Sequence, residues 1–116
     1  MKERLNIDII RPIIEKANIK TNEKLYEILR MYKTDEYIYI DAMIRYTKLD
    51  KKTVIEILEL LNDEKILKKY YTINCHNCGH SIKKFFTKKE LTEEIYCDHC
   101  DSEVIVEGYK AVYKVV

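Results

Sequence analysis

Four cysteines in two closely spaced pairs constrain this chain more than any other feature. Cys75 and Cys78 form one Cys-x-x-Cys pair, Cys97 and Cys100 form the second, and the chain has no other cysteine. Each pair places two sulfur atoms on one tight turn, and two such turns brought together offer the four thiolates in tetrahedral array that Zn²⁺ prefers. The spacing therefore predicts one structural zinc ion held by all four cysteines.

Two other uses of the cysteines stay open at this stage, a pair of disulfides and a redox-active dithiol. A redox enzyme usually carries one such pair at the start of a helix in a βαβ setting, which a β-rich stretch with two pairs does not match. Gly79 directly follows the first pair and can adopt the positive φ that a metal-binding turn often needs. The chain also has no apolar run near the roughly 18 residues that span a bilayer and no signal-like start, so we expect no membrane partner and a cytoplasmic location, where reducing conditions favour metal over disulfides.

The three histidines, His76, His80 and His99, lie in or beside the cysteine pairs. His80 could replace a cysteine as a ligand, but four thiolates make a further donor unnecessary, so we expect all three on the surface of the turns. A four-cysteine shell also leaves no open position for a reactive water. Because no catalytic triad, phosphate-binding glycine loop or paired-carboxylate cleft is recognisable, we expect no enzymatic activity.

The region before the cysteines has the periodicity of short helices. Residues Asp8 to Ala17 place Ile9, Ile10, Ile13, Ile14 and Ala17 on one broad face, with Asp8 as the expected N-cap. A second helix is expected from Asn22 to Tyr32, capped by Thr21 or Asn22.

The middle of the chain alternates strand and helix signals. Tyr37 to Ile40 suits a short strand, and Asp41 is expected to cap a brief helix. Asp50 should open a longer helix whose buried side is Val54, Ile57, Leu58 and Leu61, and an extended run, Lys68 to Ile73, then leads to Cys75. Near the C-terminus, strands are expected at Glu94–Cys97, at Glu103–Val106 and at Tyr109–Val116, the last pairing with Lys68 to Ile73.

This order resembles the winged helix-turn-helix family of the MarR and ArsR type over roughly residues 20 to 73. The matching residues are Ala42, Ile44, Leu49, Asp50, Thr53, Val54, Leu58, Leu61, Ile66 and Leu67. The chain departs from the family in having no glycine between Leu61 and Ile66, which leaves the helix end looser or capped by Asn62. From Tyr71 onward the chain resembles a zinc ribbon.

The combination is similar to the N-terminal half of archaeal transcription factor E and to small accessory proteins of bacterial operons, including phage-defence operons. The resemblance implies an α+β fold: a winged helix with an extra N-terminal helix, followed by a small β-rich zinc ribbon. The expected domains are residues 1–20 (N-terminal helix), 21–73 (winged helix) and 74–116 (zinc ribbon and closing strand).

The outward arc of the long helix carries Lys52, Ile55, Glu56, Glu59 and Leu60. In a DNA-binding protein this arc would enter the major groove, where phosphates repel carboxylates. A protein-docking surface is therefore one interpretation, and the other is that Ile55 and Leu60 pack internally and leave a solvated face. Lys51 and Lys52 could still contact phosphate.

A basic group near the cysteines allows two interpretations. It consists of Lys68, Lys69, Lys83, Lys84, Lys88 and Lys89, with the aromatic residues Tyr70, Tyr71, Phe85 and Phe86 between them. Aromatic residues between lysines form stacking platforms for single-stranded nucleic acid, but more often they cover a small core. The net charge of +1 gives no overall field that would decide the matter.

The sequence thus favours a non-enzymatic zinc-binding accessory subunit that docks on a larger protein, with a nucleic-acid-handling or defence machine as the candidate host. The docking surfaces would be the outward arc and the Ile-rich N-terminal helix. The alternative is a DNA-binding regulator of double-stranded DNA, homodimeric through the N-terminal helix and using Lys51, Lys52 and the basic group. A thiol redox or metal sensor would need the zinc to be labile.

Overall fold

The chain divides into two compact units. The computed structural model describes residues 3–75, 77–79, 82, 85–92, 95–97, 99–104 and 109–116. Unit 1 comprises Met1–Lys68 and Tyr113–Val116, and unit 2 comprises Lys69–Val112. The α-helices α1 to α4 all belong to unit 1, and the four cysteines belong to unit 2.

Helix α1 (Ile7–Lys16) begins two residues earlier than the expected N-cap at Asp8 implies. The side chain of Asn6 accepts a hydrogen bond from the Asp8 N–H at 3.0 Å, so Asn6 is the N-cap and the expectation of Asp8 was wrong. Asp8 lies instead in the first turn, where its charge favours the positive end of the helix dipole. The expected broad apolar face is narrower than its sequence suggests, because Ile10 and Ile14 are buried while Ile9 stays 56% exposed.

Helix α2 (Glu23–Leu29) is capped as expected by Asn22, whose Oδ1 accepts from the Leu25 N–H at 3.0 Å. The same side chain donates through Nδ2 to the carbonyl of Thr47 at 3.0 Å, which ties α2 to the end of the next helix. The helix stops before Tyr32, because Tyr32 donates three residues back, to the carbonyl of Leu29 at 3.1 Å.

Strand β1 (Tyr37–Tyr39) leads directly into helix α3 (Ile40–Thr47), and helix α4 (Lys51–Asp63) follows. Ile40 belongs to the helix, and Asp41 lies in its first turn because Tyr39 is the N-cap residue, so the expected Asp41 cap was wrong. The expected start of α4 is confirmed: the Asp50 side chain accepts from the Thr53 N–H at 3.0 Å. The buried residues of α4 are those its periodicity predicted: Val54, Ile57, Leu58 and Leu61.

The C-terminal end of α4 places a lysine where helices usually use glycine. The Ile66 N–H donates to the Leu61 carbonyl and the Lys65 N–H to the Asn62 carbonyl, both at 3.0 Å. This pair of bonds requires a left-handed residue after the cap, and Lys65 adopts it with φ 61°. The cap residue is Glu64, so the suggestion that Asn62 caps the helix was wrong.

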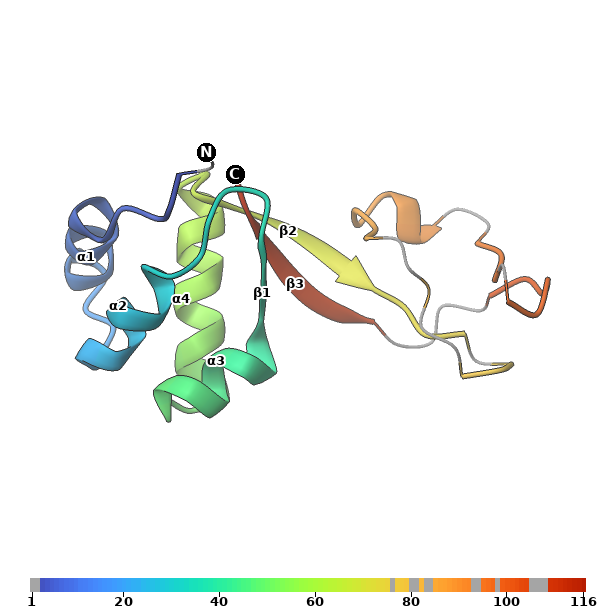
Figure 1. The fold of residues 1–116 in the computed structure, drawn as a ribbon, viewed down its shortest axis with the longest axis horizontal. Helices are drawn as coiled ribbons and strands as arrows, with labels where there is room; N and C mark the ends of the chain where they lie inside the picture. The colour runs from blue at the N-terminus through green and yellow to red at the C-terminus, as the bar shows by residue number, and fades with distance from the viewer. Residues whose placement is uncertain are drawn as a thin grey trace. The chain divides into compact units, whose positions relative to one another are not determined.

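Strands β1, β2 (Leu67–Thr72) and β3 (Lys110–Val115) form a three-stranded antiparallel sheet in the described part of the chain, in the order β1-β3-β2 (Figure 1). The expected pairing of the last strand with β2 is confirmed. β3 also pairs with the segment entering β1, since the Asp35 N–H donates to the Val115 carbonyl at 2.8 Å and the Val115 N–H to the Glu36 carbonyl at 2.9 Å. The fold is therefore of the α+β class.

The core of unit 1 joins the helices to the sheet. Tyr113 of β3 is completely buried, and its hydroxyl donates to Glu59 Oε1 of α4 at 2.9 Å. The other large buried side chains of unit 1 are Leu5, Ile10, Ile14, Leu25, Tyr26, Leu29, Ile38, Met43, Val54, Ile57, Leu58, Leu61, Leu67 and Val115. Within the described residues, the helices are too short or too polar to cross a membrane.

We predict that Lys65→Gly stabilises the protein by about 0.5–1 kcal/mol, because glycine adopts the left-handed conformation without the steric cost that a β-carbon imposes. The free energy of unfolding, measured by urea denaturation, checks this. The matched control is Lys52→Gly at an exposed helical position of α4, where glycine should lower stability by about 0.5–1 kcal/mol. Equal changes in the free energy of unfolding for the two substitutions would contradict the left-handed conformation of Lys65.

A second prediction concerns the ion pair between α1 and α2. Arg11 donates to both carboxylate oxygens of Glu23, at 2.8 and 2.9 Å, and its guanidinium lies 4.1 Å from the Tyr26 ring centroid. These hydrogen bonds lower the pKa of Glu23 below its ordinary value of 4.5. Because the pKa falls on folding, the stabilisation is present above pH 4.5 and is lost as the pH drops through the folded-state pKa.

Glu23→Gln should therefore be less stable than the wild type at pH 7, and the gap should close in acid. Melting temperatures of both proteins from pH 7 down to pH 3, followed by helical circular dichroism, measure the gap. An acid-induced change in unit 2, such as loss of a metal bound by its cysteines, would occur in both proteins and would cancel in the difference between their melting temperatures. A gap that stays constant with pH would rule out the ionised pair as its source.

Candidate metal centre

The two cysteine pairs lie on backbone turns that close in the same way. In the first turn the Gly79 N–H donates to the Cys75 carbonyl at 2.7 Å, and in the second the Asp101 N–H donates to the Cys97 carbonyl at 2.8 Å. Both closing residues are left-handed, with φ 72° at Gly79 and φ 54° at Asp101. The sequence predicts this role for Gly79. It was missed for Asp101, although aspartate tolerates the left-handed region and directly follows the second pair.

The turns bring all four sulfur atoms within 4.8 Å of one another. The Cys75 and Cys100 sulfurs lie 3.6 Å apart, and the Cys78 and Cys97 sulfurs 3.7 Å apart. These separations exclude disulfides, whose sulfurs lie about 2.05 Å apart. They agree with the edge of about 3.8 Å that four sulfurs at about 2.3 Å from a tetrahedral zinc would have. The four cysteines could therefore hold one metal ion such as zinc.

Polar groups beside the sulfurs favour the thiolate form. The Asn77 side-chain amide donates to Cys100 Sγ at 3.8 Å and to Ser102 Oγ at 3.1 Å. Hydrogen bonding by Ser102 lowers the pKa of the Cys100 thiol from 9.0 to about 6. Since the thiolate is the form that binds a metal, Asn77 and Ser102 support the site. Neither residue was predicted from the sequence, because both occupy loop positions that no spacing rule singles out.

The metal-binding residues are part of the small core of unit 2. Among the described residues, Cys75 and Cys97 are buried in a cluster with Ile73, Phe86, Ile95 and Val104, and the partly buried Ile82, Leu91 and Cys100 pack against it. Backbone pairing is sparse: single antiparallel bridges join Tyr71 to Phe86 and Tyr96 to Glu103 in the described part of the unit. The expected strands Glu94–Cys97 and Glu103–Val106 are represented there by the second bridge, while Glu94, Ile105 and Val106 lie outside the described residues.

Two of the three histidines, His76 and His80, lie outside the described residues, and so do Lys83 and Lys84 of the basic group. The possibility of His80 as a ligand therefore stays a prediction. His99 is exposed in the second turn.

The remaining predicted contact residues are spread over both units. Lys51, Lys52 and Glu56 are exposed on α4, while Ile55 and Leu60 are half-buried. Glu59 accepts the hydrogen bond of Tyr113, which gives it a structural role in unit 1. Both lysines of β2 were predicted contact residues. Lys68 is exposed, and Lys69 is half-buried, with its ammonium 5.5 Å from the centroid of the Tyr71 ring.

No protein-family model matches this chain, and no curated protein or solved structure matches it either. Its function is therefore argued from its own residues.

We predict that the purified protein contains one equivalent of metal and that Cys78→Ser lowers this content and unfolds unit 2. Losing one thiolate removes a quarter of the ligand shell, and structural zinc sites supply folding free energy directly. Elemental analysis and hydrogen exchange over residues 69–112 measure the two effects. The matched control is His99→Ala in the second turn, which should keep the metal. A Cys78→Ser protein with full metal content and unchanged protection would contradict the site.

Proposed function

We propose that this protein is a non-enzymatic, zinc-binding winged-helix accessory subunit that docks on a larger protein, and that this host handles nucleic acid or belongs to a defence machine. The observation that carries the docking proposal is a groove on unit 1 that has apolar side chains among its lining residues. The zinc and the winged helix rest on separate observations.

The donor set supports zinc as the metal. Four thiolates whose sulfur atoms all lie within 4.8 Å of one another suit Zn²⁺, whereas Mg²⁺ and Ca²⁺ prefer oxygen ligands. Four protein ligands complete the shell of a structural zinc, and such a shell has no position at which water could be activated. The proposed role of the ion is therefore to hold the two cysteine turns together.

The order of elements supports a winged helix in unit 1. Helix α2 is followed by β1, α3, α4, β2 and β3, and β3 lies between the other two strands. This is the arrangement that the resemblance to the winged helix-turn-helix family implies. The residues between β2 and β3, which would form the wing, are those that carry the four cysteines.

The groove of unit 1 supports docking. It has a volume of about 260 Å³ and lies between the N-terminal segment, α1 and the end of β3. Both chain ends lie on the same side of this unit (Figure 1). Its lining residues are Glu3, Arg4, Leu5, Asn6, Ile9, Ile10, Thr34, Lys65, Ile66, Val115 and Val116.

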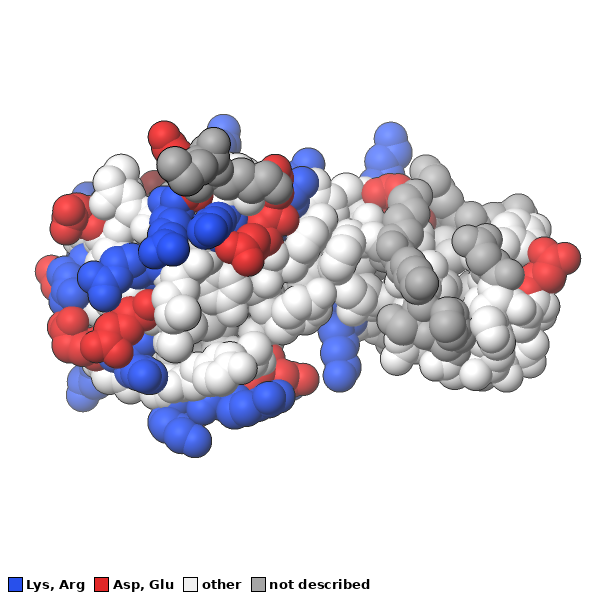
Figure 2. All heavy atoms as spheres, in the orientation of Figure 1, with Lys and Arg blue, Asp and Glu red and all other residues white. Residues whose placement is uncertain are grey.

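The apolar side chains of this groove are divided between a buried floor and an exposed rim. Leu5, Ile10 and Val115 are buried, whereas Ile9 is 56% exposed and Val116 is 55% exposed. Exposed apolar side chains beside an apolar floor are typical of a surface that another protein covers. Figure 2 shows, away from the chain ends, residues other than Lys, Arg, Asp and Glu in a band across the viewed face of unit 1, bordered by side chains of both charges.

We predict that Ile9→Asp abolishes capture of the host protein by this subunit, because a carboxylate at the rim would be desolvated without a partner when the groove is covered. The measurement is quantitative mass spectrometry of proteins captured from the native host by wild-type and variant chains. The matched control is Met31→Asp, which replaces an equally exposed apolar side chain outside the groove. The docking proposal predicts a partner lost with Ile9→Asp and kept with Met31→Asp. A partner lost with both variants or with neither would contradict docking through the groove.

The alternative function, a regulator of double-stranded DNA, is favoured by Lys51 and Lys52, which are exposed in the first turn of α4. Glu56, exposed one turn later on the same helix, opposes it because phosphates repel carboxylates. Duplex binding that weakens steeply with salt and is lost in Lys51→Gln/Lys52→Gln would support this alternative. Absence of duplex binding at low salt would exclude it.

A further inference from the structure

Unit 2 carries two tyrosines in contact, one exposed and one half-buried. The rings of Tyr71 and Tyr109 lie 4.9 Å apart between centroids and are nearly perpendicular, at 83°. This edge-to-face contact leaves at least one face of the Tyr109 ring uncovered by Tyr71, and Tyr109 is 53% exposed. Tyr71 is half-buried.

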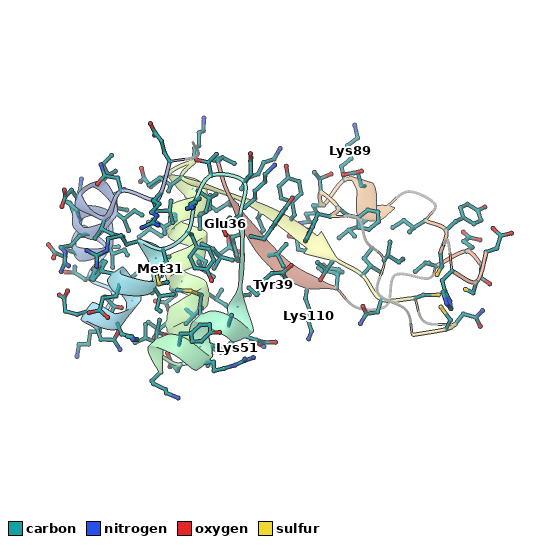
Figure 3. The ribbon with its side chains drawn as sticks, in the orientation of Figure 1. Met31, Glu36, Tyr39, Lys51, Lys89 and Lys110 are labelled. Carbon is teal, nitrogen blue, oxygen red and sulfur yellow. The ribbon has the colours of Figure 1, made fainter. Side chains whose placement is uncertain are left out.

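Positive charge accompanies these rings. The Lys69 ammonium lies 5.5 Å from the centroid of the Tyr71 ring, within the distance at which a cation is attracted to a ring face. Lys69 and Tyr71 lie two residues apart on the same side of the chain in β2. Lys110 follows Tyr109 directly at the start of β3 and extends away from the strand (Figure 3), and strand alternation directs it to the face opposite Tyr109.

The aromatic residues of unit 2 range from buried to exposed. Phe86 is buried in the small core, and its backbone exchanges two hydrogen bonds with Tyr71: the Tyr71 N–H donates to the Phe86 carbonyl at 2.8 Å, and the Phe86 N–H donates to the Tyr71 carbonyl at 2.9 Å. The interpretation that the aromatic residues between the lysines cover the small core of unit 2 therefore holds for Phe86. It does not account for Tyr109, whose ring is more exposed than buried and contacts a second tyrosine rather than the core cluster.

We propose that unit 2 binds single-stranded nucleic acid on a tyrosine platform formed by Tyr109 and Tyr71, with Lys69 contacting the phosphates. A flat exposed ring with a neighbouring ammonium group matches unpaired bases, which offer a ring face and a phosphate at every nucleotide. The bases of a duplex are stacked on each other and cannot reach such a ring. An acidic protein segment would pair with the lysine but would leave the ring face unused. This proposal concerns unit 2 and does not depend on docking through the groove of unit 1.

The test uses the intact, metal-loaded chain and fluorescence anisotropy with labelled single strands of about 20 nucleotides, longer than the roughly 4–16 that one small module covers. Oligo-dT and oligo-U arms distinguish DNA from RNA. We expect binding that weakens with salt and that Tyr109→Ala weakens by about 5- to 100-fold, the range for losing one stacking contact. Tyr109→Phe should keep the affinity, Tyr109→Leu should lose it, and Lys69→Gln should weaken it and reduce its salt dependence.

The matched control is Tyr96→Ala. Tyr96 is 55% exposed in the same unit, but its backbone pairs with Glu103 and not with a lysine-bearing strand, so affinity should not change. Metal content and melting temperature of each variant establish that it is folded, and Tyr109→Leu substitutes for Tyr109→Ala if the latter is not. The proposal is overturned if no single strand binds at low salt, or if Tyr109→Ala and Tyr96→Ala behave alike. It is also overturned if a duplex binds as tightly as the single strand, or if poly-glutamate displaces the oligonucleotide with equal efficiency.

Discussion

Unit 2 depends on the meeting of four sulfur atoms. Among the described residues of unit 2, the buried cluster around Cys75 and Cys97 contains only Ile73, Phe86, Ile95 and Val104 besides these two cysteines, and the backbone pairing outside β2 and β3 is limited to isolated bridges. Burial by so few residues is small compared with the conformational entropy of ordering a segment of this length. The zinc ion that we propose would link the two cysteine turns and supply folding free energy on the order of 10 kcal/mol.

The position of the cysteines in the chain extends this dependence to the sheet. The chain reaches β3 only after passing through residues 73–109, and β3 is the central strand that pairs with both β1 and β2. β3 also supplies Tyr113 and Val115 to the core of unit 1. Closing a long loop costs entropy, and a metal that orders part of that loop lowers the cost of bringing β3 into place. The proposed ion would therefore favour the pairing of strands that it does not contact.

Much of the fold followed from the sequence where one local signal dominates. Asp50 before an apolar helical repeat predicted the start and the buried face of α4, and alternation in the last residues predicted β3 and its pairing with β2. Errors arose where two residues compete for one role. Asn6 and Asp8 can both cap α1, and the backbone conformation that decides between them is not visible in the sequence. Lys65 occupies a left-handed position that a search for glycine overlooks.

The residues of the candidate metal site also fall into those that the sequence predicts and those that only the folded structure reveals. Spacing alone identified the four cysteines and Gly79, since a Cys-x-x-Cys pair carries its own geometry. Asn77 and Ser102 support Cys100 through side-chain hydrogen bonds between the two turns, a relation that exists only after folding. The predicted pairing of the last strand with β2 already brings the segments of Tyr71 and Tyr109 together, but the edge-to-face contact of their rings depends on side-chain positions that the sequence does not give.

Zinc K-edge X-ray absorption of the purified full-length chain is the most direct test of the central claim. The account predicts a single shell of four sulfur atoms at about 2.3 Å. A shell containing nitrogen or oxygen, or a chain without metal in which residues 69–112 remain folded, would contradict it.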